Sequence, residues 1–310
     1  MVYRGWDPAK IVCIENNPAY VALTSAAMRE LGIEVLCQDL LTWLTHMRFD
    51  VVIGNPPYNN RGKVKGQKNT SGTSLWVQFL RKIPELMAEG SWCSLLVPSA
   101  VGNTNSVGWR AIRSTRVESI KTGLSEQYFK VGTAISQVTF IKDEPSSTME
   151  INGEVVDRSQ MVVAPLDPNP IAVGIMYKLQ NTGTKMNWKR TNFPAFVKIA
   201  QANPSVIGMP ALDRGNHLRP RSLEALTSGK NLSKCEMLSI EVDNQEAFIE
   251  VLKHPLLRFF HTQSASTGNL TLGSIREITL PDGWETINLF KSYSLTTEET
   301  NFIKEWAKVN

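Results

Sequence analysis

The chain has 310 residues, 42% hydrophobic and 20% charged, and carries a net charge of +4, a composition that excludes disordered and collagen-like proteins. No apolar run reaches the ~18 residues that span a bilayer, and residues 1–16 do not have the pattern of a signal peptide. The four cysteines are scattered without a C-x-x-C pair, and the four histidines lack metal-ligand spacing. We therefore expect a cytoplasmic protein with reduced thiols, no metal site and no membrane partner.

The positive charge is concentrated in one window of the chain. Between residues 178 and 234 ten Lys and Arg face two acids, so this window is +8 and the remainder is −4. Such a window predicts a polyanion as partner of the second half. A solvated basic face is the alternative on charge alone.

The first half of the chain alternates strand and helix signals. Apolar residues at 10–14, 33–37, 49–53 and 91–97 predict strands, and helical spacing predicts helices over 18–31, 40–47 and 75–87. Asn17 is placed to cap the first helix, with Gly32 and Gly90 ending the first and third. Residues 117–120 and 136–141 predict further strands. This alternation indicates an α/β fold, with a parallel sheet covered by helices.

The alternation of strand and helix signals ends after Pro145. From there prolines divide the chain into shorter pieces rich in Asn, Ser, Thr and Arg. We expect a second domain of loops, short strands and a few helices, closed by a helix over 296–308 with Thr297 as its cap. The domains are placed at 1–150 and 151–310. This agrees with the two domains that the length predicts.

The motif with the clearest chemistry is Asn55-Pro56-Pro57-Tyr58, directly after the predicted strand 49–53. Open α/β sheets bind ligands at the carboxyl ends of their strands. The prolines fix the backbone and remove two donors, so a carbonyl stays free to accept a hydrogen bond. The Asn oxygen and this carbonyl can together hold one amino group, and the tyrosine offers a flat face to a base. A rigid turn without a ligand is the alternative.

Residues 49–58 (FDVVIGNPPY) resemble the catalytic motif of S-adenosylmethionine-dependent N6-adenine DNA methyltransferases, in particular the TaqI and Eco57I types. The resemblance covers residues 10–142 well and 245–305 weakly. It implies a Rossmann-like class I methyltransferase sheet followed by a mixed α+β target-recognition domain. It also implies S-adenosylmethionine as cofactor and double-stranded DNA as partner, with a cognate restriction endonuclease as a further partner.

The resemblance assigns roles to individual residues. Glu15 matches the acid that binds the cofactor ribose, Asp39 matches the one that contacts its adenine, and Leu40 and Asn55 join the cofactor site. Residues 55–58 become the catalytic motif, with Tyr58 and Phe129 stacking on the extruded base and Tyr128 in reserve. Trp76 matches a motif that lines the cofactor pocket, although we expect it to be a core residue.

Basic residues complete the predicted DNA interface. The segment after the motif contains four of them and no acid, which favours contact with phosphates. The remainder come from the +8 window. The predicted DNA-binding residues are Arg61, Lys63, Lys65, Lys68, Lys189, Arg190, Arg214, Arg219 and Arg221.

The sequence departs from the family before its first predicted strand. The family's first strand and glycine-rich loop should precede residues 10–14, but residues 1–10 contain no G-x-G. We therefore expect a sheet that is incomplete at this strand. Three interpretations stay open: an N-terminally truncated enzyme, a missing segment or subunit supplied by a partner, or an inactive protein.

The predicted function is site-specific adenine-N6 methylation of DNA, of restriction-modification or phage type. Two alternatives remain from the sequence. One is a methyltransferase with the same tetrapeptide that acts on RNA or on a protein glutamine, although the latter has no need of a +8 region. The other is a DNA-binding remnant that has lost catalysis.

Overall fold

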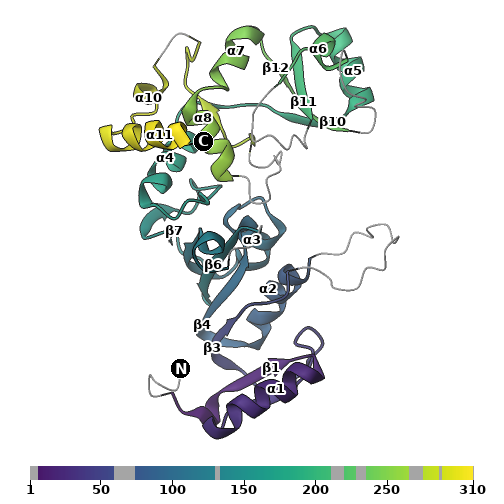
Figure 1. Ribbon diagram of the computed structural model, residues 1–310, viewed down its shortest axis with the longest axis vertical. Coiled ribbons are helices and arrows are strands. Elements are labelled where there is room, and N and C mark those ends of the chain that lie inside the picture. The colour runs from purple at the N-terminus through teal and green to yellow at the C-terminus, as the bar shows by residue number, and fades with distance from the viewer. Residues whose placement is uncertain are drawn as a thin grey trace.

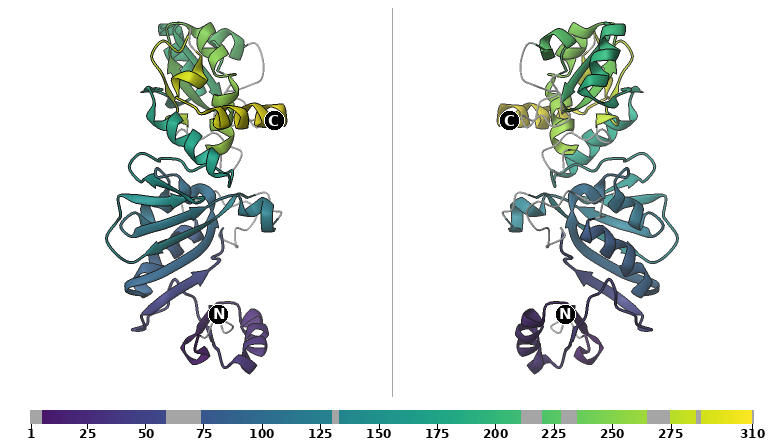
Figure 2. Two further views of the ribbon diagram at one scale, coloured as in Figure 1. Left: turned by 90° about the vertical axis from the view of Figure 1, so that its left-hand side faces the viewer. Right: turned by 90° about the vertical axis from the view of Figure 1, so that its right-hand side faces the viewer.

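The computed structural model describes residues 6–58, 74–129, 133–210, 220–227, 235–264, 275–285 and 288–309 (Figure 1). Its elements form an elongated molecule, with the amino-terminal strands at one end, a larger sheet in the middle and the carboxyl-terminal half at the other end (Figures 1 and 2). No helix in these ranges is long and apolar enough to cross a membrane.

The amino-terminal unit, which we define as residues 6–48, holds β1 (Val12–Glu15), α1 (Pro18–Met28) and β2 (Glu34–Cys37). The strands pair in parallel, with Glu15 opposite Cys37. As expected, Asn17 caps α1 by accepting a hydrogen bond from the amide of Ala19 at 3.0 Å, and Gly32 ends this helical segment with a φ of 69°. No residue of this unit is buried.

The central sheet has the order β3-β4-β6-β5-β7-β8. Its strands are β3 (Phe49–Gly54), β4 (Met87–Pro98), β5 (Arg116–Lys121), β6 (Ile135–Ile141), β7 (Thr148–Ile151) and β8 (Glu154–Asp157). The pairs β3–β4 and β5–β7 are parallel, while β6 runs antiparallel to both of its neighbours. The sheet is therefore mixed, in an α/β fold of Rossmann-like type.

Two helices, α2 (Leu75–Leu86) and α3 (Val107–Ile112), form a core with the central sheet. Leu80 of α2 packs with Cys93 and Phe140 of the sheet, all fully buried. The Trp76 ring lies so close to Gly108 that a β-carbon there would be 2.1 Å from it, so the glycine permits this helix contact. Trp76 is a core residue, as expected.

The amino-terminal unit and the central sheet are two separate sheets. Within the described ranges β1 pairs only with β2 and β3 only with β4, so β1 and β3 are both edge strands. The strand that the sequence analysis expects to be missing would lie between these two edges. Leu40 packs against the same hydrophobic cluster as Tyr58, which connects the unit to the central sheet.

Two local predictions are wrong. Residues 40–47 form a turn and irregular chain instead of a helix: Asp39 accepts from the amide of Leu41 at 3.0 Å, and Leu44 is 91% exposed with no core to pack on. Gly90 does not end α2, because the helix stops at Leu86 just after Pro84, and Gly90 lies within β4.

The second half contains two packed groups. Strands β10 (Lys189–Asn192), β12 (Glu236–Glu241) and β11 (Val206–Pro210) form an antiparallel sheet in that order, flanked by α5 (Phe193–Ala202), α6 (Leu223–Thr227) and α7 (Gln245–Val251). The other group comprises α4 (Pro170–Asn181), α8 (Pro255–Ser264), α10 (Leu289–Ser292), α11 (Thr297–Val309) and the short pair β9 (Thr184–Lys185) and β13 (Thr279–Leu280). This is the mixed α+β composition expected there.

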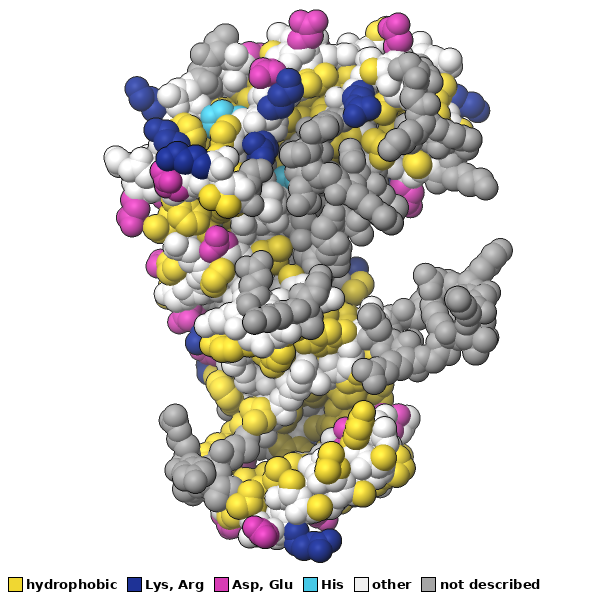
Figure 3. All heavy atoms as spheres, viewed as in Figure 1, with side chains coloured by type: hydrophobic (Ala, Val, Ile, Leu, Met, Phe, Trp, Pro, Cys, Tyr) yellow, Lys and Arg dark blue, Asp and Glu magenta, His cyan; other side chains and the backbone are white. Residues whose placement is uncertain are grey.

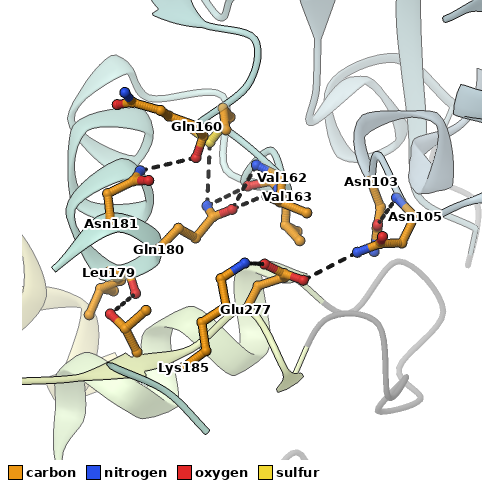
Figure 4. Close-up of polar contacts among 12 residues, drawn as sticks. Asn103, Asn105, Gln160, Val162, Val163, Leu179, Gln180, Asn181, Lys185 and Glu277 are labelled. Atoms are coloured by element: carbon orange, nitrogen blue, oxygen red, sulfur yellow. Dashed lines mark hydrogen bonds and ion pairs between the residues drawn. The ribbon is translucent and has the colours of Figure 1, made fainter. Parts of the chain in front are cut away.

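The segment between the halves, residues 158–169, forms hydrogen bonds with both, and Figure 4 shows its bonds with Gln180 and Asn181 of α4. Ala164 donates its amide to Gly102 O on the first half, at 2.9 Å. Gln180 of α4 accepts from the amides of Val162 and Val163 at 2.9 and 2.8 Å. Because β8 ends at Asp157, the expected division at 150/151 falls within the β7–β8 hairpin, seven residues before the end of the sheet.

Candidate active site

The Asn-Pro-Pro-Tyr motif lies where β3 ends. Gly54 is the last residue of β3 and pairs with Leu95 of β4, so Asn55 emerges at the carboxyl edge of a parallel strand pair. Asn55 is exposed, Pro56 is buried and Tyr58 is half-buried against the core of the central sheet. Burial raises the pKa of Tyr58, which keeps its phenol neutral near neutral pH. The motif thus has one rigid buried residue and one accessible amide side chain.

A groove of about 980 Å³ lies beside the motif, and we call it the strand-end groove. It is bordered by Ile53 and Gly54 of β3, by Lys121 at the end of β5, and by Tyr128 and Phe129. The two aromatic rings are 66% and 39% exposed. The structure therefore brings the end of β3 and the late aromatic segment, 75 residues apart in sequence, to one concave surface. Asn55 and Tyr58 themselves do not line it.

The aromatic segment Ser125–Phe129 is fixed at its beginning. Ser125, 6% exposed, donates its hydroxyl to Thr133 O at 2.8 Å and accepts from the amide of Ile135 at 2.6 Å. These bonds attach the segment to the start of β6. Tyr128 and Phe129 therefore project from an anchored turn at the rim of the groove.

Asn152 holds the opposite side of the strand-end groove. It turns the β7–β8 hairpin with a φ of 51°, a conformation that Asn tolerates better than most residues. Its Oδ1 accepts from the amide of Thr122 at 2.9 Å, and its Nδ2 donates to Asp167 O at 3.0 Å. The hairpin turn is thereby tied to the end of β5 and to the segment between the halves.

The acids predicted to hold the cofactor lie on the amino-terminal unit. Glu15 ends β1 and Asp39 follows β2, so both lie at the carboxyl end of one parallel strand pair. Glu15 Oε1 accepts from the amide of Asn17 at 2.8 Å, and no other described residue bonds to its second oxygen. Both carboxylates are exposed or half-exposed at this edge, which fits the ribose and adenine of an adenosine ligand. Neither acid lines the strand-end groove.

The predicted DNA contacts lie partly outside the described residues. Arg61, Lys63, Lys65, Lys68, Arg214 and Arg219 fall there. Lys189 and Arg221 are exposed, and Arg190 forms an ion pair with Glu236 across β10 and β12. Figure 3 shows Lys and Arg side chains gathered over the carboxyl-terminal half, at the top of its view.

Sequence analysis missed several residues of the strand-end groove, among them Lys121, Thr122, Gln137 and Asn152. Two signals were available. Asn152-Gly153 between two short apolar runs is typical of a hairpin turn, and Gly123 follows the strand 117–120. Gln137, which donates to Ser94 Oγ at 2.7 Å across β4 and β6, had no signal, because only strand register places it there.

Comparison with known proteins adds to this geometry. The family model described as Eco57I restriction-modification methylase matches residues 19–127. Modification methylase CviBIII of Paramecium bursaria Chlorella virus NC1A is 29% identical over 106 residues, which are 31% of this chain and 26% of that protein. The chain thus spans about a quarter of the length of this relative.

Solved structures also resemble the chain. A class I S-adenosylmethionine-dependent methyltransferase described as putative, from Listeria monocytogenes, has 18% identity and a TM-score of 0.36, covering 45% of this chain and 48% of its own. A modification subunit of a type I restriction enzyme from Vibrio vulnificus, also described as putative, has 16% identity and a TM-score of 0.35, covering 45% and 34%.

The first half of the molecule therefore has an α/β fold of the class I methyltransferase type. More particularly, residues 19–127 are similar to S-adenosylmethionine-dependent DNA methyltransferases of the restriction-modification kind. S-adenosylmethionine is the methyl donor of this class.

Proposed function

We propose that this protein is a site-specific DNA adenine-N6 methyltransferase of restriction-modification or phage type. The observation that carries the proposal is the position of the Asn-Pro-Pro-Tyr motif, at the carboxyl end of β3 and beside a groove bordered by Phe129. The family match of residues 19–127 supports methyl transfer, and the +8 window supports a nucleic-acid substrate.

The motif has the hydrogen-bonding groups that an adenine amine requires. This amine is a poor nucleophile because its lone pair is delocalised into the ring. Asn55 Oδ1 and the Pro56 carbonyl can accept its two hydrogens, which favours a pyramidal nitrogen with a localised lone pair. Their contribution is positioning and electrostatic stabilisation, since little proton transfer is needed before attack.

The base must leave the duplex before it reaches the motif. Unstacking costs a few kcal/mol, and stacking on an aromatic side chain returns about 1–3 kcal/mol per base. Phe129, anchored through Ser125 at the rim of the strand-end groove, is suited to this role. Tyr58 is held against the core, and its exposed part can form a second face.

Glu15 and Asp39 would hold the adenosine part of S-adenosylmethionine, as hydrogen-bond acceptors for the ribose hydroxyls and the adenine amine. When bound, this cofactor supplies an electrophilic methyl group on a sulfonium. The edge position of both acids leaves them accessible to a ligand.

Methyl transfer to unmethylated bacterial DNA, followed by nucleoside mass spectrometry, tests the proposal. We expect N6-methyladenine in the wild-type product and none with Asn55→Ala, which removes an acceptor from an exposed position without loss of core volume. Asp50→Ala, at an exposed position of β3, is the matched control and should keep its activity.

Other products would redirect the proposal. Methylated RNA or protein glutamine with unmodified DNA would assign a different substrate. DNA binding without any methyl transfer would indicate a binding remnant. Near-normal kcat in Asn55→Ala would refute the assigned mechanism.

A further inference from the structure

The second half contains a groove of about 720 Å³ that the assignments above do not use. One wall is formed by Pro220, Arg221, Ser222 and Ala225, and the other by α7, the residues that follow it and the start of α8. Its volume lies within the range of ligand sites, about 300–1,000 Å³. We call it the Arg221 groove.

Cations from three parts of the chain border this groove. They are Arg221, Lys253 after α7 and Arg258 of α8, against one acid, Glu246. Arg221 and Lys253 are exposed and Arg258 is half-buried. The lining also contains polar residues, Ser222 and Gln245, and apolar ones, among them the half-buried Ile249 and the fully buried Leu252.

Both walls are fixed by bonds within the second half. Arg221 exchanges two backbone hydrogen bonds with Gly208 of β11, at 2.7 and 3.0 Å. Gly208 in turn packs on the Phe196 ring, where a β-carbon would approach to 2.5 Å. Across the groove, Gln245 at the start of α7 donates to Pro204 O at 2.5 Å, close to the beginning of β11. The backbone of both walls is therefore held in place within the second half.

We propose that the Arg221 groove binds the sugar-phosphate backbone of DNA, with phosphates at Arg221, Lys253 and Arg258. This inference rests on the proposed function, because it assumes a DNA substrate. The groove also borders the window 178–234, whose net charge of +8 attracts a polyanion.

Lys253 can reach a phosphate at small cost. Its present partner is Glu250 at 2.6 Å, and the two side chains are 61% and 74% exposed. Pairs this exposed contribute little to stability, about 0–1 kcal/mol. The lysine can therefore exchange a solvated carboxylate for a phosphate, and the release of counterions from DNA favours that exchange.

The test is the salt dependence of duplex affinity, measured by fluorescence anisotropy on the full chain. Arg221→Gln with Lys253→Gln removes two groove charges. Lys304→Gln with Lys308→Gln on α11 is the matched control, because it removes two exposed charges, one of them in a like i,i+3 pair with Glu305. The groove variant should lower the slope of log K against log salt by about 0.9 per phosphate contact, and the control should not.

Equal slopes in the wild type and in both variants would overturn the proposal, as would wild-type binding to polyglutamate as tight as to duplex DNA. Arg221→Lys with Lys253→Arg should restore the slope, which separates loss of charge from loss of folding. The two proposals fail differently. Wild-type methylation of DNA with an unchanged slope in the groove variant refutes only the groove, and groove-dependent binding without methylation refutes only the enzyme.

Discussion

Helices α1 and α8 have similar lengths and lie in opposite halves of the molecule. The eleven residues of α1 include Val21 and Leu23, yet none of the eleven is buried. The ten residues of α8 bury six side chains, among them Phe259 and Phe260. The difference lies in what surrounds each helix: α1 faces a two-stranded sheet, while α8 meets α11 and the core of the second half. Apolar side chains thus stabilise a helix only where neighbouring elements bury them.

The well-packed residues and most of the residues assigned to cofactor binding lie in different regions of the molecule. Three of the four residues assigned to the cofactor, Glu15, Asp39 and Leu40, lie on the amino-terminal unit, in which no residue is buried. The aromatic core lies in the half that carries no recognised catalytic motif. Sites that bind ligands are often drawn from the less stable parts of a protein. The following predictions test this division from the largest expected effect to the smallest.

Phe259→Ala should destabilise the protein by about 3–5 kcal/mol, because the ring is fully buried. It also forms edge-to-face contacts with Phe302 and Trp306. Leu23→Ala on α1 should change stability by less than about 0.5 kcal/mol, because that side chain is 70% exposed. Urea unfolding measures both. If Leu23→Ala lowers the free energy of unfolding as much as Phe259→Ala does, α1 is buried by another element in solution. That result would contradict the difference between α1 and α8.

Glu15→Gln should weaken S-adenosylmethionine binding about tenfold, or ~1.4 kcal/mol, because a charged acceptor for the ribose hydroxyls is lost. Glu34→Gln is the control, since Glu34 lies at the opposite end of the same strand pair. Equilibrium dialysis at high protein concentration suits this measurement. We expect weak binding by the wild type too, because no described residue of this unit cradles the methionine part. Equal affinities of the two variants would remove Glu15 from the site.

Thr296→Ala should cost about 1 kcal/mol, because Thr296 is the cap of α11. Its hydroxyl accepts from the amide of Glu299 at 3.1 Å, and Glu299 Oε2 accepts from the amide of Thr296 at 2.7 Å, which is a capping box. Thr297→Ala should have a smaller effect. Thermal unfolding decides between the two, and the opposite ranking would favour Thr297 as the cap.

Helix α11 shows which structural features short-range sequence patterns can predict. The sequence predicts a closing helix but places its cap at Thr297, because two threonines precede the same apolar pattern and only the side-chain bonds distinguish them. In the first half the predicted strands and the Asn17 cap are confirmed, since short-range spacing determines them. Residues 40–47 fail because a helix that short requires a core which the sequence cannot show.

The features that the sequence did not predict depend on contacts between residues far apart in the chain. The proximity of the β3 end to Phe129 could be expected only through the family resemblance, because strand order, not local pattern, creates the strand-end groove. The Arg221 groove has no local signal either. It depends on the bridge between Arg221 and Gly208 and on the approach of α7, which hold residues far apart in sequence.

The smallest expected effect concerns the pH response of the well-packed half. His254 is half-buried beside the Phe290 ring, and its Nδ1 accepts from the amide of Leu256 at 3.2 Å. Burial lowers the pKa of His254, so the unfolded chain binds a proton more readily than the folded one. Stability should therefore fall as the pH drops below the unfolded value of about 6.5 and continue to fall through the lower folded pKa.

Urea midpoints at about pH 7 and about pH 5 measure this loss. His254→Asn should reduce the pH dependence while its side-chain oxygen still accepts from Leu256, because Asn caps helices well and does not titrate. His46→Asn, in the amino-terminal unit, should leave the dependence as it is, because that residue is exposed and bonds to no described neighbour through its ring. If His46→Asn removes the pH dependence and His254→Asn does not, the acid-sensitive contact lies in the amino-terminal unit, and the assignment of stability to the carboxyl-terminal core is wrong.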